Sequence, residues 1–312
     1  MEVLEGTNFN IGKRYEGKVR DNYTVNDKRI IVVTDRISAF DVVLGTIPYK
    51  GQVLNQMAKF WFEKTKDIVA NHMLSTPDPN VMVVKECEPV MVEMVVREYL
   101  TGVTTTSIWY NYKNGVRLFC GNNLAEGMKK DQKLDKPIIT PSTKAEKGDH
   151  DESISADEVV KRGLLTKAEM DELSDISLKL FARGKEIVSK QGLILVDTKY
   201  EFGKLDGKFV LIDEIHTPDS SRFWFKDSYL KLFMEGREQA KLDKEYVRTW
   251  LAEKGFIGEG KIPPIPNEVI MEASRRYIEA YEKITGEKFH KYEDKKPIVK
   301  RVEENLRNAG FA

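Results

Sequence analysis

The sequence predicts an α+β fold with two lobes, a β-rich N-terminal lobe and a mixed α/β lobe after it. Two observations lead to this prediction. Short β-branched runs alternate with turn residues over the first hundred positions, whereas helical patterns dominate the later part of the chain. The length of 312 residues exceeds one typical domain of about 100–200 residues, so we expect a division into residues 1–96 and 97–312.

The composition is that of a soluble globular protein, with 41% apolar and 32% charged residues. Fifty basic residues balance fifty acidic ones, so no net field draws the chain to nucleic acid or to anionic lipid. Cys87 and Cys120 are too few for a disulfide framework, and no apolar run is long enough for a signal peptide or a membrane span. We expect a cytoplasmic protein without membrane or nucleic-acid partners.

In the N-terminal part, strands are expected around residues 30–33, 81–84 and 90–96, where β-branched residues cluster between turns. One helix interrupts them, because apolar residues recur at helical spacing at Leu54, Met57, Ala58, Trp61 and Phe62. The tract 129–152 contains few apolar residues, which favours a long functional loop and a candidate lid.

The later part begins with two capping boxes, at Ser155 and Thr166, and the second helix is expected to run to about Lys190. Apolar runs at 193–196 and 209–212 flank a turn around Asp206-Gly207, which indicates a hairpin. A further helix is expected over 267–284 with Gly286 as its stop, and Pro297 opens the last one.

The first candidate site is a glycine turn. Residues 12–18 have the G-x-x-x-x-G-K spacing of a phosphate-binding loop, but Val19 stands where a hydroxyl residue is needed, and residues 19–25 read as extended. A turn between two strands fits better, with backbone amides and Lys18 or Arg20 lying over a polyphosphate. The alternative is a β-hairpin with a solvated basic tip.

The second candidate is a charged strand face, because Asp197, Lys199 and Glu201 alternate with apolar residues. A two-residue turn pairs Glu201 with Ile212 and places Asp213 on the opposite face. A three-residue loop sets Asp213 opposite Lys199, and only this register is expected to bring two carboxylates together for Mg²⁺. The alternative is a solvated strand face with a cross-strand ion pair.

Three weaker candidates each have an ordinary structural explanation as well. Residues 213–222 end in a turn with hydroxyls, an acid and Arg222, which suits a phosphate or carboxylate but also an Asx or Ser/Thr turn. The polar stretch 140–152 contains hydroxyls and Lys144, which could hold an amino acid or lie on a surface loop. Arg97, where a strand ends, is a ligand anchor or a surface ion pair.

Six segments together, in order along most of the chain, resemble the SAICAR synthetase family of purine biosynthesis: residues 17–21, 35–41, 97–102, 140–146, 197–203 and 217–222. The resemblance implies an ATP-dependent ligase that joins L-aspartate to the carboxylate of carboxyaminoimidazole ribonucleotide (CAIR). ADP and phosphate are released, and the product is the amide SAICAR. It also implies a nucleotide lobe and a mixed lobe similar to kinases and ATP-grasp enzymes, with ATP between them.

The resemblance also implies roles for particular residues. Those expected to bind ATP are Gly17, Lys18, Val19 and Arg20 over the phosphates, with Glu93 at the adenine-side hinge. Glu201 and Asp213 would hold Mg²⁺. The ribonucleotide phosphate would be gripped by Arg97, Ser107 and Arg222. The reacting end would be lined by Asp41, Lys199 and Asp219. Ser142 and Lys144 lie in the tract expected to bind aspartate, which resembles the yeast-like branch of the family.

One departure concerns the loop after Gly102, which reads Val103 to Ser107 where many members have Thr-Gly-Ser. The phosphate hydroxyl therefore belongs to Ser107, Thr104 or Thr106.

The expected reaction proceeds through an acyl phosphate, because a carboxylate is a poor acyl donor until ATP activates it. The base that takes the amine proton is left among Asp219, His150 and Asp151. The oligomeric state is expected to be a monomer or a small homo-oligomer.

Two other functions are weighed against the ligase. A small-molecule kinase would use the same ATP lobe, but the His-Arg-Asp and Asp-Phe-Gly motifs are absent from the sequence. A nucleic-acid or nucleotide-binding module would use the basic edge from Lys13 to Arg20, which the zero net charge disfavours.

Overall fold

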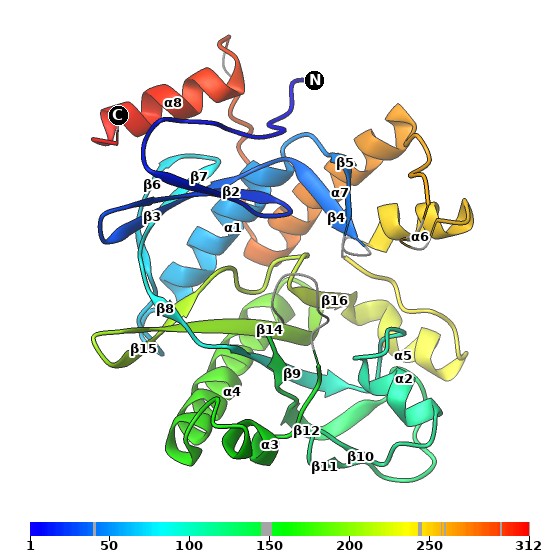
Figure 1. The fold of residues 1–312 in the computed structure, drawn as a ribbon. Coiled ribbons are helices and arrows are strands. Elements are labelled where there is room, and N and C mark those ends of the chain that lie inside the picture. The colour runs from blue at the N-terminus through cyan, green and yellow to red at the C-terminus, as the bar shows by residue number, and fades with distance from the viewer. Residues whose placement is uncertain are drawn as a thin grey trace.

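The computed structural model describes residues 1–39, 42–144, 152–242, 245–256, 258, 260–293 and 295–311. Two antiparallel sheets dominate it, one built from the N-terminal part and one from the middle of the chain, with helices around both (Figure 1). The predicted α+β fold class is confirmed.

The first sheet has the strand order β1-β2-β3-β7-β6. Its strands are β1 (Lys13–Glu16), β2 (Arg20–Val25), β3 (Lys28–Val33), β6 (Met73–Asp78) and β7 (Val81–Lys85). A separate pair, β4 (Arg36–Ala39) and β5 (Val42–Thr46), leads into α1 (Lys50–Thr65). The predicted strands and helix of this region are confirmed. A strand, β2, follows the glycine turn, whereas a phosphate-binding loop of the G-x-x-x-x-G-K type is followed by a helix. The sequence-based rejection of such a loop therefore agrees with the structure.

The second sheet has the order β12-β9-β14-β15, with β13 paired to β9 and with β8 and β16 paired to β14. Its strands are β8 (Glu88–Pro89), β9 (Val92–Tyr99), β12 (Lys133–Ile139), β13 (Ser142–Thr143), β14 (Leu193–Leu205), β15 (Lys208–Ile212) and β16 (Ser221–Phe225). A small pair, β10 (Leu118–Phe119) and β11 (Asn122–Asn123), stands apart. The predicted lobe boundary after residue 96 lies inside β9.

The other helices are α2 (Ile108–Lys113), α3 (Ala156–Lys161), α4 (Lys167–Ser189), α5 (Lys226–Met234), α6 (Glu245–Glu253), α7 (Asn267–Thr285) and α8 (Ile298–Asn308). Both predicted capping boxes receive support, since the Ser155 hydroxyl accepts from the Glu158 amide at 3.1 Å and Thr166 exchanges bonds with Glu169. Gly286 ends α7 with a φ of 74°, as its position predicts. Among the residues described, no helix has the length and apolar character needed to cross a membrane.

The expectation of one long loop over 129–152 is wrong for the part that the structure describes. β12 and β13 both pair with β9, so this segment forms the edge of the second sheet. An edge strand bonds through its backbone and leaves most of its side chains partly or fully exposed, so it needs few apolar residues. Residues 145–151 of the predicted lid lie outside the described residues.

The hairpin between β14 and β15 closes with a two-residue turn. Leu205 pairs with Lys208 and Glu201 pairs with Ile212. Asp206 and Gly207 both have left-handed backbone angles, φ 51° and 74°, which a type I′ turn requires and which match the twist of the strands. Of the two registers left open by the sequence, the structure has the one with the two-residue turn, not the three-residue loop on which the metal site was expected to depend.

Two cores hold the molecule together, and β3 contributes to both. Its residues Ile31 and Val33 face the main core with α1, whereas Ile30 and Val32 face a smaller core that α8 completes with Val302 and Leu306. The C-terminal helix therefore covers the N-terminal sheet, and Figure 1 shows α8 beside the N-terminal strands and α7 beside α1. Residues far apart in the sequence share one packed body.

Candidate functional site

A cavity of about 520 Å³ lies between the two sheets. Its first wall comes from the glycine turn and from strands β2, β3 and β7, and its second wall comes from β9, β14 and the end of β15. It is lined by Gly17, Lys18, Val19, Arg20, Asn22, Arg29, Ile31, His72, Val84, Lys85, Cys87, Pro89, Glu93, Lys144, Lys199, Glu201, Ile212 and Asp213. All seven residues predicted to bind the nucleotide and its metal are among them.

Arg36 shapes the glycine turn from behind. Its buried guanidinium donates to the carbonyl oxygens of Gly17 and Lys18, each at 3.0 Å, and to the Asp21 carboxylate at 2.9 Å. The Thr34 hydroxyl donates to the Val19 carbonyl at 2.8 Å. These hydrogen bonds hold the carbonyl groups of Gly17, Lys18 and Val19 in place, so they fix the backbone of the turn at the wall of the cavity.

Lys199 is the centre of a charged cluster on the second wall. Its ammonium donates to Glu93 at 2.6 Å and to Glu201 at 2.5 Å, and the Lys144 ammonium donates to the other Glu201 oxygen at 2.5 Å. Burial opposes the charge on Glu201, but the two ammonium groups outweigh it and lower the pKa of Glu201 to about 2. Burial likewise opposes the charge on Lys199, yet Glu201 and Glu93 raise its pKa above the usual value.

The hairpin has the two-residue turn, for which strand alternation predicts that Asp213 lies on the face opposite to Glu201. Asp213 nevertheless lines the same cavity as Glu201. The reason is that β15 ends at Ile212 and Asp213 has a left-handed φ of 64°, so alternation stops there. The Arg20 guanidinium pairs with the Asp213 carboxylate and, at 3.0 Å, with Glu214. These ion pairs join the first sheet to the loop after β15.

No group of three or more His, Cys, Asp or Glu side chains that could hold a metal ion is found within the described residues. Glu201 and Asp213 are two carboxylates that line the same cavity. Mg²⁺ that is bound together with phosphate oxygens typically takes one or two protein carboxylates.

A second cluster gathers around Asp197, near the centre of the second sheet. Arg222 donates to its carboxylate at 2.5 Å, and the buried Arg97 lies 3.6 Å from the same oxygen. Arg97 also donates to the Thr140 hydroxyl at 2.9 Å, and burial lowers its pKa below the usual value. The structure thus brings together two arginines predicted to grip one phosphate.

Ser107 lies beside this pair. A Cβ on Gly102, where φ is 95°, would lie 2.5 Å from the Ser107 hydroxyl and 3.3 Å from an Arg222 nitrogen. The Ser107 and Thr104 hydroxyls are 2.7 Å apart, whereas Thr106 offers Arg97 its carbonyl oxygen. The Thr104 hydroxyl also lies 3.5 Å from the Thr106 hydroxyl, so the three candidate hydroxyls lie close together beside this cluster.

Asp219 lies in the loop between β15 and β16, where Lys50 of α1 and Tyr277 of α7 contact its two carboxylate oxygens. The sequence patterns did not single out either partner. Ser142 donates to the Glu152 carbonyl at 3.2 Å, beside Lys144. Asp41, His150 and Asp151 lie outside the described residues.

Asp35 and Arg36 begin the matched segment 35–41, in which the sequence analysis assigned a role to Asp41 alone. The Asp35 carboxylate accepts from the amides of Gly51 and Leu4, each at 2.8 Å, so it fixes the start of α1. Burial raises its pKa above the usual value. The sequence signal that could have indicated them is an Asp-Arg pair one residue after the apolar run 30–33.

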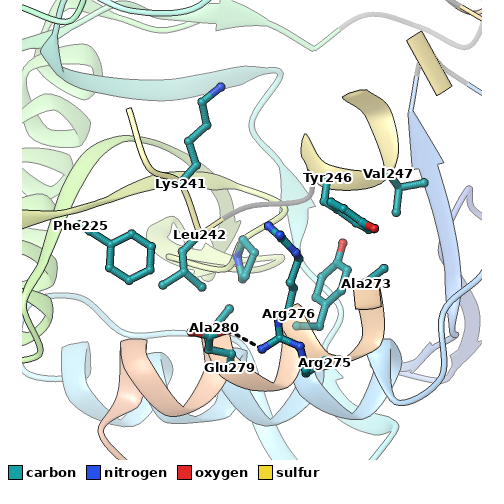
Figure 2. Close-up of a pocket in the computed structure, with 12 residues that line it drawn as sticks. Phe225, Lys241, Leu242, Tyr246, Val247, Ala273, Arg275, Arg276, Glu279 and Ala280 are labelled. Carbon is teal, nitrogen blue, oxygen red and sulfur yellow. Dashed lines mark hydrogen bonds and ion pairs between the residues drawn. The ribbon is translucent and has the colours of Figure 1, made fainter. Parts of the chain in front are cut away.

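A separate cavity of about 210 Å³ lies against α7 (Figure 2). Figure 2 shows the Arg276 side chain extending from α7 toward Tyr246, and its guanidinium lies 4.3 Å from the centre of that ring. The cavity is lined by Pro218, Phe225, Lys241, Leu242, Tyr246, Val247, Ala273, Arg275, Arg276, Tyr277, Glu279 and Ala280. Pro218 and Tyr277 connect its wall to Asp219.

Comparisons with known proteins agree with these groupings. Residues 13–262 match the family model described as SAICAR synthetase. A phosphoribosylaminoimidazole-succinocarboxamide synthase of Bacteroides thetaiotaomicron is 51% identical over 315 residues, which cover 99% of each chain. A solved SAICAR synthase of Saccharomyces cerevisiae, complexed with SAICAR, is 30% identical with a TM-score of 0.80, covering 92% of this chain and 100% of the other. A SAICAR synthetase solved with ADP is 26% identical with a TM-score of 0.66, covering 89% and 100%. The resemblance is confirmed, and the chain belongs to the SAICAR synthetase family.

Proposed function

We propose that ATP binds in the cavity between the two sheets, with its phosphates under the glycine turn. As a member of its family, the chain is an ATP-dependent ligase of purine biosynthesis that joins L-aspartate to CAIR. The observation that carries the placement is the cavity lining, where Gly17 to Arg20 face Lys199, Glu201 and Asp213. Such a combination of backbone amides, cations and carboxylates suits a polyphosphate with a divalent ion.

Glu201 and Asp213 are proposed to hold Mg²⁺. Both carboxylates line the cavity, and both face cations: Lys144 and Lys199 at Glu201, and Arg20 at Asp213. A divalent cation suits the same positions, since two carboxylates supply the charge and phosphate oxygens complete the shell. When bound, the ion neutralises charge on the transferred phosphoryl group.

Arg97 and Arg222 are proposed to bind the phosphate of CAIR, with the Ser107 or Thr104 hydroxyl beside them. Asp197 draws both guanidinium groups to one side of the second sheet, and a pair of neighbouring guanidinium groups suits the charge and geometry of a phosphate. With this end of CAIR fixed, its carboxylate would extend toward Lys199 and the nucleotide cavity. Positioning of this kind supplies much of the rate of a phosphoryl transfer.

The reaction then needs two displacements. A carboxylate oxygen of CAIR attacks the γ-phosphorus of ATP, the bond to ADP breaks, and an acyl phosphate forms. The aspartate amine attacks the acyl carbon, the bond to phosphate breaks, and the amine proton passes to a base. Lys199 stabilises the developing charge, and Lys144 with Ser142 is proposed to receive an aspartate carboxylate. Asp219 and Asp41 are proposed for the reacting end.

We also propose that the enzyme works in the cytoplasm as a monomer or small homo-oligomer, on small-molecule substrates alone. The low cysteine content supports the location, and the balanced net charge supports the restriction to small-molecule substrates.

The test is a coupled ADP-release assay with ATP, magnesium and CAIR, run with and without L-aspartate, while mass spectrometry detects SAICAR. ADP and SAICAR should appear together in equal amounts, and only when aspartate is present. ADP without an amide would instead indicate a kinase or an ATPase and would overturn the proposed use of the second substrate. A chelator should abolish turnover if Mg²⁺ is required.

A further inference from the structure

Lys50 breaks two local rules of protein structure. Its side chain is 0% exposed, although lysine is rarely buried, and it is the first residue of α1, where the helix dipole disfavours a cation. The preceding Tyr49 has a left-handed φ of 66°, which costs energy for an aromatic residue. Residues that break local rules without local compensation occur preferentially at functional sites.

The contacts of Lys50 lead to Asp219. The ammonium lies 3.0 Å from one Asp219 oxygen and 5.4 Å from the centre of the Tyr277 ring. The Tyr277 hydroxyl donates to the other Asp219 oxygen at 2.7 Å. Within the described part of the chain, Asp219 is the one carboxylate within 4.0 Å of this ammonium. Each carboxylate oxygen therefore has its own fixed partner.

The surroundings of this trio are rigid. The Ser274 hydroxyl of α7 donates to the Pro48 carbonyl at 2.7 Å, and the Gly51 amide donates to Asp35 at 2.8 Å. The Asp219 amide donates to the Thr217 hydroxyl at 3.3 Å. Helix α1 from the first half of the chain and α7 from its end thus hold one loop residue between them.

We propose that Lys50 and Tyr277 are positioning residues that orient Asp219 for the ligation, which rests on the proposed role of Asp219 at the reacting end. Asp219 is only 10% exposed, so a free carboxylate could rotate and lose its direction toward the substrates. The Tyr277 hydroxyl directs one oxygen through a hydrogen bond, and the buried Lys50 ammonium attracts the other as an ion pair, so the two contacts together favour one orientation of the carboxylate.

The test compares Tyr277→Phe, Lys50→Met and Asp219→Asn in the full-length enzyme, alone and as the two double variants with Asp219→Asn. Both positioning variants should lower kcat for SAICAR formation by about 100-fold, the scale of a misplaced group. The KM for ATP should stay unchanged, because neither residue lines the nucleotide cavity. Each double variant should be no slower than Asp219→Asn, since all three changes disrupt one unit.

Tyr246→Phe is the matched control, because this tyrosine lines the same small cavity as Tyr277 but its ring packs against the Arg276 guanidinium, so kcat should not change. In Lys50→Ala, added ethylammonium should restore part of the rate, whereas ethanol should not, because only a cation replaces the ion pair. A purely structural lysine would show no such rescue.

Wild-type kcat in Tyr277→Phe and Lys50→Met, or rate losses that multiply with that of Asp219→Asn, would overturn the inference while leaving the ligase function intact. Failure of the wild-type enzyme to make SAICAR would instead overturn the proposed function. If Lys50→Met does not fold, as judged by circular dichroism, Tyr277→Phe decides alone, because it removes a single oxygen atom.

Discussion

Glu201 lies between two ammonium groups, and this placement keeps its carboxylate charged. Its pKa of about 2 lies below the value of about 4.3 expected in an unfolded chain. A group with a lowered folded-state pKa stabilises the fold above the unfolded value, and that contribution disappears as the pH falls toward 2. At neutral pH Glu201 is therefore an anion, as a ligand for a divalent cation must be.

We predict that Glu201→Gln and Asp213→Asn each reduce kcat by about 100-fold or more, because losing a carboxylate removes several kcal/mol of charge stabilisation at the phosphoryl group. The far-UV circular dichroism spectrum should not change. Glu214→Gln is the control, since Glu214 also pairs with Arg20 but has no proposed metal role. Near-wild-type turnover in either of the first two variants would contradict the metal assignment.

A second prediction at the scale of single residues concerns Gly102 and the binding of CAIR. A Cβ there would meet the Ser107 side chain at 2.5 Å, and the φ of 95° adds strain of about 1–3 kcal/mol for other residues. Gly102→Ala should therefore raise the KM for CAIR about tenfold or more without changing the KM for ATP.

Gly115→Ala is the matched control for this experiment. Gly115 has nearly the same φ, 94°, but a Cβ there would meet nothing within 4 Å. An equal rise in the KM for CAIR in both variants would show that backbone strain, rather than the Ser107 position, is responsible.

At the scale of elements, His216 connects the loop between β15 and β16 to the helices and the strand around it. Its ring nitrogen Nε2 lies 2.6 Å from the Tyr200 hydroxyl of β14, and the ring packs edge-on against Trp61 of α1 at 4.5 Å. Gly184 of α4 leaves room for it, because a Cβ there would lie 2.4 Å from His216 Cε1. One buried histidine thus fixes the segment between Asp213 and Asp219 against three elements.

This burial predicts a pH dependence of stability. Burial lowers the pKa of His216 to about 3, whereas an unfolded histidine titrates near 6.5, so the unfolded chain binds more protons between these values. Stability should therefore fall as the pH drops below about 6.5, by up to about 1.4 kcal/mol per pH unit for each such histidine. His72 is buried in the same way, with a pKa of about 3.

Urea unfolding between pH 4.5 and 7 measures this dependence. His216→Asn should weaken it, and asparagine tolerates the left-handed φ of 51° at this position. His290→Asn is the control, because His290 is exposed. A slope that His216→Asn leaves unchanged would mean that the histidine does not carry the effect.

At the scale of the whole molecule, α8 closes the N-terminal sheet through a buried ion pair. Arg301 donates to Asp78 at 3.0 Å and to Asn80 at 2.7 Å, and Asn305 donates to Asp78 at 2.7 Å. Arg301 and Asn305, which both bond to Asp78, lie in the last helix of the chain. The first sheet, and with it the glycine turn, therefore depends on the C-terminus.

Arg301→Met should destabilise the protein by about 3–5 kcal/mol, because it leaves the buried Asp78 carboxylate without its cation. The free energy of unfolding in urea measures the effect, and Arg307→Met on the exposed side of α8 should change it little. A loss below about 1 kcal/mol for Arg301→Met would indicate that the ion pair contributes little to closing the sheet.

Local chemistry in the sequence was enough to predict much of the fold. The caps at Ser155 and Thr166, the stop at Gly286 and the turn at Asp206-Gly207 each depend on a few neighbouring residues, so they could be identified before any packing was known. Six motifs in order also identified the family. The grouping of the predicted nucleotide residues in one cavity agrees with that identification.

Only the tertiary structure decided the rest. The register of the hairpin, the return of Asp213 to the cavity, the edge strand β12 and the cover of α8 on the first sheet all depend on how distant segments pack. The pairing of Lys50 and Tyr277 on Asp219 joins three segments far apart in sequence. Periodicity and turn chemistry act over a few residues, whereas such contacts form only when the whole chain has folded.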